Sequence, residues 1–163
     1  MNKVKYAAIV AIMLLIPLVN NAQVVRNFTS SNLKGEVVNY QALSGEKLTV
    51  IDFWASWCRP CLKAMPKLQK VYTEYKSKGV SFIGVNVDGP RSFSKALPLV
   101  NSLNITYPNI SDIEGKLKEE LEVSSMPTLL IIDHNNKVVF RHEGFASGDE
   151  EEWRSIIDKL LAE

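Results

Sequence analysis

Three short apolar runs limit the fold of this chain more than any other feature. They are Leu48–Trp54 ("LTVIDFW"), Val80–Val87 ("VSFIGVNV") and Thr128–Asp133 ("TLLIID"), and each is rich in β-branched residues. Continuous apolar runs of this length are typical of strands that are buried on both faces of a sheet. Such a sheet needs a covering layer on each side, so the runs predict an α/β protein.

Helical patterns lie between and after these runs. Residues 58–78 carry one apolar stripe, Pro66 is expected to bend the helix, and Gly79 is expected to end it. Further helices are predicted over residues 90–103, where Pro98 is expected to interrupt or bend the helix, and over residues 112–121. The members of the first stripe are Cys61, Met65, Leu68, Tyr72 and Tyr75.

The two ends of the chain add a hairpin and a last helix. Residues 28–33 and 36–38 flank the turn Lys34-Gly35 and predict an N-terminal β-hairpin. Residues 138–142 predict a strand that returns beside the third apolar run. The final stripe begins at Trp153, and Asp149 with Glu152 before it resembles a capping box. The whole pattern predicts a three-layer α/β/α sandwich with a mixed central sheet.

Residues 1–22 differ in character from the rest. Lys3 and Lys5 precede the apolar run of residues 6–19, and the chain becomes polar before Ala22. This order predicts a secretory signal peptide over residues 1–22, with an uncleaved membrane anchor as the alternative. Residues 23–163 are then a single domain.

The charge balance argues against a polyanionic partner. The 163-residue chain has a formal net charge of +1, and removal of Lys3 and Lys5 with the leader leaves 17 basic and 18 acidic residues. Basic residues are scattered along the sequence rather than clustered. We therefore expect no binding to nucleic acid.

The two cysteines, Cys58 and Cys61, are separated by two residues. A bridge that closes so short a loop removes little entropy from the unfolded chain, which disfavours a structural staple. A structural zinc site needs four ligands, and His134 and His142, which we expect at the surface, are the only histidines. We expect no bound metal, although a copper-binding module that uses both thiols and a histidine is an alternative.

A redox role fits the pair better. Residues i and i+3 of a helix lie about 5 Å apart at Cα, within the range of a disulfide. Cys58 is placed at the helix N-terminus, where free N–H groups favour a thiolate. It is therefore predicted to be the nucleophile, and the more shielded Cys61 to be the resolving cysteine.

The stretch "IDFWASWCRPC" resembles the active site of thioredoxins. The order of elements over residues 24–163 is more similar to the exported TlpA/ResA-like branch of the thioredoxin-like superfamily. This resemblance implies the same roles for Cys58 and Cys61, with Trp57 and Pro60 shaping the site. No cofactor is implied.

The resemblance also identifies residues outside the cysteine motif. Pro127, in "SSMPT", matches the cis-proline of the superfamily, so Met126 and Pro127 are expected to bind extended substrate backbone. Gly144 matches the glycine after the last strand. Residues 89–111 correspond to the insertion that marks this branch.

Asp52 interrupts its apolar strand at the position where thioredoxins carry a buried carboxylate. Burial would raise its pKa toward neutrality, so that it could accept the proton of Cys61. A purely structural hydrogen bond is the alternative. Ala64 stands where many TlpA/ResA-like relatives have a glutamate, and residues 80–87 lack the lysine of thioredoxins.

Arg59 lies between the two cysteines, where many thioredoxins have glycine. A cation there would stabilise the thiolate and raise the reduction potential. A solvated side chain with little effect is the alternative.

The expected function is a thiol–disulfide oxidoreductase of the periplasm or cell envelope. The resemblance implies that it reduces disulfides of exported proteins and that a membrane thiol carrier returns the electrons. Some relatives act in cytochrome c maturation. We expect a monomer. A disulfide oxidase is the first alternative. Peroxidase relatives are disfavoured because their proline–threonine context around the reactive cysteine is missing. A copper-binding module or a redox-inert binding domain represents another class.

Overall fold

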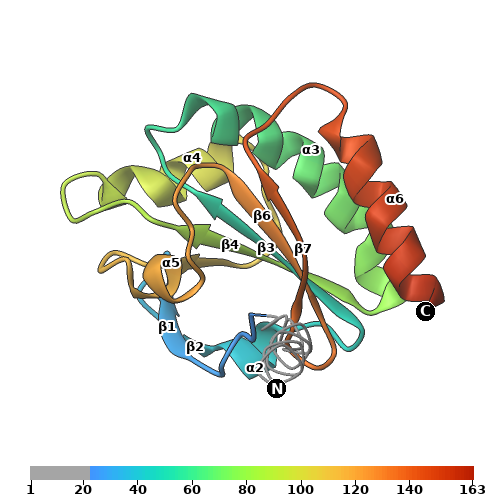
Figure 1. The fold of residues 1–163 in the computed structure, drawn as a ribbon. Helices are drawn as coiled ribbons and strands as arrows, with labels where there is room; N and C mark the ends of the chain where they lie inside the picture. Colours follow the sequence, from blue (N-terminus) through green and yellow to red (C-terminus); the bar gives the residue numbers. More distant parts are fainter. Residues whose placement is uncertain (1–22) are drawn as a thin grey trace, which may run out of the picture.

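The computed structural model describes residues 23–163, and the predicted signal peptide over residues 1–22 lies outside them. The described chain forms one seven-stranded sheet in the order β2-β1-β5-β4-β3-β6-β7 (Figure 1). The strands are β1 (Thr29–Asn32), β2 (Val37–Asn39), β3 (Leu48–Trp54), β4 (Val80–Asn86), β5 (Asn109–Ser111), β6 (Thr128–Asp133) and β7 (Val138–Glu143).

The sheet is mixed, as predicted. Strand β4 runs parallel to both β3 and β5, whereas β6 runs antiparallel to β3 and to β7. Strands β1 and β2 form the predicted N-terminal hairpin, and β1 joins it to β5 in antiparallel register. The short strand β5 therefore connects the hairpin to the central strands.

Helices cover both faces of this sheet. Figure 1 shows α3, α4 and α6 on one side and α2 and α5 on the other. The helices are α2 (Tyr40–Leu43), α3 (Arg59–Tyr75), α4 (Ala96–Ser102), α5 (Lys116–Glu120) and α6 (Asp149–Ala162), with 3₁₀ turns η1 (Lys76–Lys78) and η2 (Phe93–Lys95). The three-layer α/β/α prediction is confirmed.

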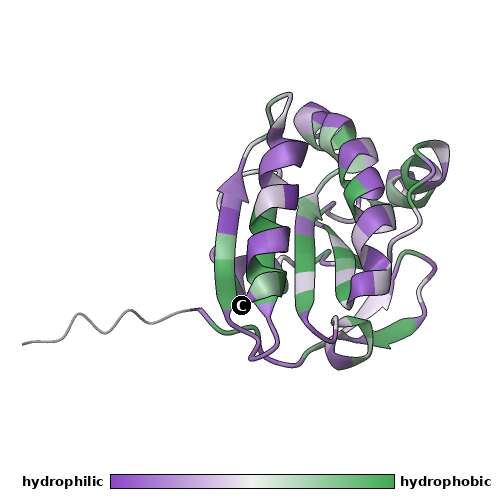
Figure 2. Ribbon diagram, turned by 90° about the vertical axis from the view of Figure 1, so that its right-hand side faces the viewer, coloured by the Kyte–Doolittle hydropathy of each residue, from purple (hydrophilic) through white to green (hydrophobic). Residues whose placement is uncertain are grey.

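Strand β3 is buried along all seven of its residues. Because successive side chains of a strand point to opposite faces, Val50 and Trp54 enter the core under α3, and Ile51 and Phe53 enter the core on the other face. Asp52 alternates with the first group and so faces α3. Figure 2 shows hydrophobic residues concentrated in the strands, and hydrophobic and hydrophilic residues alternating along the helices.

Most predicted helices are present at the expected positions, but their first and last residues differ from the prediction. Helix α3 runs through Pro66, η1 continues it, and Gly79 follows with φ +84°. Residues 90–103 contain η2 and α4, so the division falls before Ala96, and α4 runs through Pro98. In the expected helix of residues 112–121, only Lys116–Glu120 is helical. Asp112 lies before it and accepts hydrogen bonds from the N–H groups of Leu117 and Lys118.

The capping box predicted from Asp149 and Glu152 is wrong. Asp149 is the first residue of α6, and its Oδ2 accepts a hydrogen bond from the N–H of Ala146 at 2.7 Å. The same oxygen lies 3.0 Å from His142. A contact with β7 therefore replaces the local contact within the helix.

No helix within residues 23–163 has both the length and the apolar character that a membrane crossing requires.

Gly84 allows a buried hydrogen bond to form beside Asp52. In β4 it pairs with Asp52 of β3 and with Asn109 of β5. Trp54 Nε1 donates to Asn109 Oδ1 at 2.9 Å, and a Cβ on Gly84 would lie 2.1 Å from that oxygen. The amide of Asn109 thus occupies the space that a side chain at position 84 would need.

We expect Gly84→Ala to lower the free energy of unfolding by roughly 2–4 kcal/mol, because it overpacks the core and disturbs a buried hydrogen bond. Urea unfolding of the oxidised protein measures this change. Gly89→Ala is the control, since a Cβ there meets nothing within 4 Å. Equal losses in the two variants would contradict the prediction.

Candidate active site

Cys58 and Cys61 lie at the start of α3, as predicted. Cys58 is the N-cap of the helix, and its Sγ accepts a hydrogen bond from the N–H of Cys61 at 3.2 Å. The two residues form a disulfide, with a Cα–Cα distance of 5.3 Å. Pro60 fits the first turn because its missing N–H would have no partner there. The structure therefore represents the oxidised form of the pair.

The exposure of the site is uneven. Cys61 is completely buried and Cys58 retains 4% exposure, whereas the side chain of Trp57 is 64% exposed. Arg59 is also exposed, and no ion pair of the described chain includes it. Thus Cys61 is the more shielded sulfur, and an exposed aromatic ring lies next to Cys58 in the chain.

The loop that contains Pro127 reaches the same end of the sheet. The peptide bond between Met126 and Pro127 is cis, as expected. Strand β6 begins at the next residue, Thr128, which pairs with Phe53 near the end of β3. Gly144 has φ +84° and donates its N–H to the carbonyl of Pro127 at 2.8 Å. The end of β3 therefore lies beside the start of β6. The cysteine turn follows β3 and the proline loop precedes β6, so both lie at the same edge of the sheet.

Asp52 is a buried carboxyl group under α3. Its exposure is 3%, and its Oδ2 atom has no hydrogen-bond partner in the described residues. Burial raises the pKa of Asp52 to about 7. This value agrees with the expected shift toward neutrality, which leaves a group that can accept and release a proton near pH 7.

Ala64 adds no charge to this environment. Its side chain is buried in the same core cluster as Cys61. On β4, the residue paired with Asp52 is Gly84. Residue 64 and the β4 partner of Asp52 are therefore both small and neutral, and neither supplies a charge beside Asp52.

Sequence analysis missed three polar residues close to this region. Tyr107 has a buried hydroxyl without a partner in the described chain, and burial, followed by the charge of Asp52, raises the pKa of Tyr107. Asp88 contacts Ser56 in the loop before the cysteines. The only signal in the sequence was the position of Asp88 directly after the apolar run of residues 80–87. That position does not show which residue Asp88 contacts.

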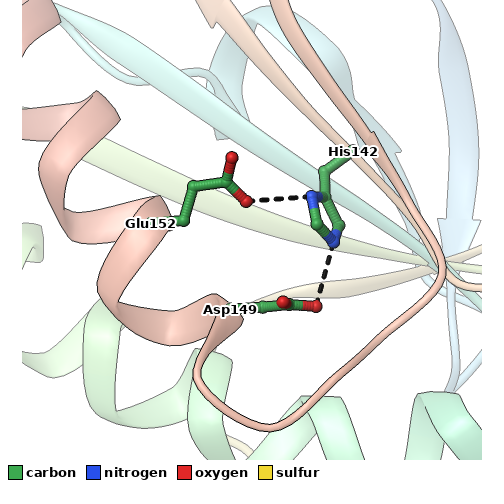
Figure 3. A group of neighbouring side chains, drawn as sticks. All are labelled: His142, Asp149 and Glu152. Atoms are coloured by element: carbon green, nitrogen blue, oxygen red, sulfur yellow. Dashed lines mark hydrogen bonds and ion pairs between the residues drawn. The ribbon is translucent and has the colours of Figure 1, made fainter.

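His142 was expected at the surface, and this expectation is wrong. Its side chain is only 20% exposed and lies between β7 and α6. Nε2 of His142 lies 3.0 Å from Asp149 Oδ2, and Nδ1 lies 3.2 Å from Glu152 Oε2. Each ring nitrogen therefore contacts a different carboxylate (Figure 3). The two contacts connect the end of strand β7 to the first turn of helix α6.

These three residues are the one set of side chains in residues 23–163 whose ligand atoms are close enough to hold a metal ion. The set includes neither cysteine. His134, the other histidine, is exposed in the turn between β6 and β7. The histidines thus do not join Cys58 and Cys61 in a common ligand group.

A pocket of about 680 Å³ opens between β1 and α5. Its apolar lining includes Phe28, Val37, Phe93 and Ile113. None of the predicted site residues lines it, so it lies apart from the cysteines.

Residues 22–141 match the sequence profile of the AhpC/TSA family. The chain belongs to this family. Among its relatives, thiol-disulfide oxidoreductase ResA of Bacillus thuringiensis (strain Al Hakam) is 34% identical over 113 residues, which cover 69% of this chain and 64% of ResA. Thioredoxin-like protein YneN of Bacillus subtilis (strain 168) is 28% identical over 141 residues, covering 86% of this chain and 81% of YneN.

The fold agrees with these sequence matches. A crystal structure from Chlorobium tepidum, assigned as thiol:disulfide interchange protein DsbE, superposes with a TM-score of 0.77 at 29% identity and covers 86% of this chain and 96% of that one. The thioredoxin-like fold and the resemblance to ResA are confirmed. The chain spans less than two thirds of the length of ResA.

The raised pKa of Asp52 predicts a specific dependence of stability on pH. Between pH 3.8 and about 7 the folded protein keeps a proton that the unfolded chain has released. Stability should therefore fall by up to about 1.4 kcal/mol per pH unit across this window, and this group should add no further change above it.

Asp52→Asn removes this contribution. We expect the stability of the variant relative to wild type to be higher at pH 8 than at pH 5, as measured by urea unfolding with the disulfide intact. Comparing each variant with wild type at the same pH cancels the other titrating groups. A difference that is the same at both pH values would show that Asp52 ionises normally.

Proposed function

We propose that this protein is an exported thiol–disulfide oxidoreductase that reduces disulfides in other exported proteins. The observation that supports it best is the Cys58–Cys61 pair at the N-terminus of α3, which follows the strand that carries the buried Asp52. The family membership and the likeness to ResA agree with this chemistry.

The reaction begins with the reduced pair. The thiolate of Cys58 attacks one sulfur of the target disulfide, and the other sulfur leaves as a thiolate. Cys61, deprotonated with Asp52 as the base, then attacks the sulfur of Cys58 and releases the second target thiol. Two electrons pass to the target, and the pair ends in the oxidised form described above. A membrane thiol carrier returns the two electrons.

The surroundings of the cysteines supply substrate contacts. The exposed ring of Trp57 offers an apolar surface, and the backbone around Met126 and Pro127 offers hydrogen-bonding groups to an extended chain. Arg59 is a further contact beside the nucleophile. No cofactor enters this reaction, and the protein acts as a monomer.

The location is the periplasm or cell envelope. Residues 1–22 serve as a signal peptide or as an N-terminal anchor, and cytochrome c maturation is the specific process proposed. The oxidase direction uses the same cysteines and is distinguished by the reduction potential. The copper-binding alternative lacks support, because within residues 23–163 no histidine shares a ligand group with the cysteines.

Cys61→Ser tests the proposal by trapping substrates. Without the resolving cysteine, the mixed disulfide on Cys58 should persist as a larger species on non-reducing gels of envelope proteins. Dithiothreitol should release the partners, which mass spectrometry identifies. Cys58→Ser is the control and should trap few or none. Absence of dithiothreitol-sensitive adducts from the Cys61→Ser protein would overturn the reductase role.

Asp52→Asn tests the proton transfer. The disulfide should still form, but turnover of a protein disulfide at pH 7 should slow by about tenfold or more, because positioned bases commonly contribute this much. Rates measured from pH 6 to pH 9 give the profile, and Asp158→Asn, an exposed site on α6, is the control. A variant with the wild-type profile would exclude Asp52 as the base.

A further inference from the structure

The loop that leads into the cysteines is held by a carboxylate from another strand. Asp88 follows the end of β4 and is completely buried. Its Oδ2 accepts a hydrogen bond from the backbone N–H of Ser56 at 2.9 Å, and its Oδ1 accepts one from the Ser56 hydroxyl, also at 2.9 Å. Ser56 lies two residues before Cys58. One side chain thus binds both polar groups that Ser56 can donate.

The carboxylate is itself fixed to the central sheet. Asn86, the last residue of β4, donates from Nδ2 to Asp88 Oδ2 at 2.8 Å, and its Oδ1 accepts from the N–H of Asp88 at 3.3 Å. The N–H of Val87, which lies between Asn86 and Asp88, donates to the carbonyl of Trp54 at 2.9 Å. The loop after β3 is therefore attached to the end of β4 through backbone and side-chain hydrogen bonds.

Asp88 carries its charge in this buried position. Burial raises its pKa, but the hydrogen bonds from Asn86 and Ser56 outweigh burial and hold the pKa of Asp88 below its ordinary value. No lysine or arginine within residues 23–163 forms an ion pair with it. Neutral donors alone satisfy the carboxylate, so its negative charge is not cancelled by a neighbouring cation.

We propose that Asp88 is a positioning residue of the cysteine site, which holds Ser56 and thereby Trp57 and Cys58 at the start of α3, and whose charge opposes the thiolate of Cys58. The exposed guanidinium of Arg59 and the N-terminus of α3 have the opposite effect, because both stabilise the thiolate of Cys58. Asp52, on the strand that leads to the pair, adds a second negative charge only when it ionises. A charge that destabilises the thiolate favours the disulfide, and so makes the pair a stronger reductant. This inference rests on the proposed redox function and assigns a tuning group to it.

Two variants separate position from charge. Asp88→Asn keeps the size of the side chain, removes the charge and replaces one acceptor by a donor. Ser56→Ala removes one hydrogen bond but keeps the charge and the backbone contact. The matched control is Asp112→Asn, because Asp112 is also a buried carboxyl, 8% exposed, that accepts from two backbone N–H groups, but it lies at the start of α5.

Two measurements on the reduced full-length protein test the charge. The first is the rate of alkylation of Cys58 by iodoacetamide from pH 5 to pH 9, and the second is the dithiol–disulfide equilibrium with glutathione. For Asp88→Asn we expect roughly three- to tenfold faster alkylation at pH 6 and an equilibrium displaced by a similar factor toward the dithiol. Ser56→Ala and Asp112→Asn should keep the wild-type pH profile and equilibrium.

The positioning role has its own measurement. Hydrogen exchange at the amides of residue 56 and Cys58, which donate to Asp88 and to the carbonyl of Ala55, should accelerate in Ser56→Ala and in Asp88→Asn, and remain unchanged in Asp112→Asn. If Asp88→Asn does not fold, unchanged exchange in Ser56→Ala overturns the proposal. If Asp88→Asn folds, a wild-type alkylation rate and a wild-type dithiol–disulfide equilibrium in this variant overturn the charge role. Both readouts need no protein substrate, so failure of the proposed reductase function would show separately, as a loss of trapped partners.

Discussion

The complete burial of β3 is the constraint on which the site depends. The strand is hydrogen-bonded to β4 on one side and β6 on the other, and helices cover both of its faces. A carboxyl group in the middle of such a strand cannot reach water, so the pKa of Asp52 rises to about 7. The same strand leads directly to Cys58. Strand burial thus provides both the rigid base of the cysteine turn and a carboxyl group that titrates near neutral pH.

The sequence predicted the features that depend on local patterns. Long apolar runs identified β3, β4 and β6, and the apolar stripe of residues 58–78 predicted a helix that begins at Cys58. Resemblance to thioredoxins added the cis peptide at Pro127. These features were predictable because neighbours along the chain, or a familiar motif, determine them. The single charged residue inside this apolar run, together with the resemblance to thioredoxins, also pointed to Asp52.

The features that could not be predicted are contacts between distant polar residues. Ser56 and Asp88 are 32 positions apart, and Trp54 and Asn109 are 55 apart. Each pair forms only because β4 lies between β3 and β5, an order that periodicity does not reveal. The failed capping box has the same cause. A polar side chain near a helix start can bind its own helix or another element, and at Asp149 it binds His142 and the preceding loop.

Asp52 and Asp88 show how the same side chain can serve two purposes in one small region. Both are buried, and burial alone raises the pKa of each. Asp88 has three hydrogen-bond donors from Ser56 and Asn86, which stabilise its charged form more than burial opposes it. Asp52 has an oxygen with no donor in the described chain, so its neutral form remains accessible near pH 7. The carboxyl group proposed to exchange a proton is therefore the one left without partners in the described chain, and the one proposed to hold the loop is fully paired.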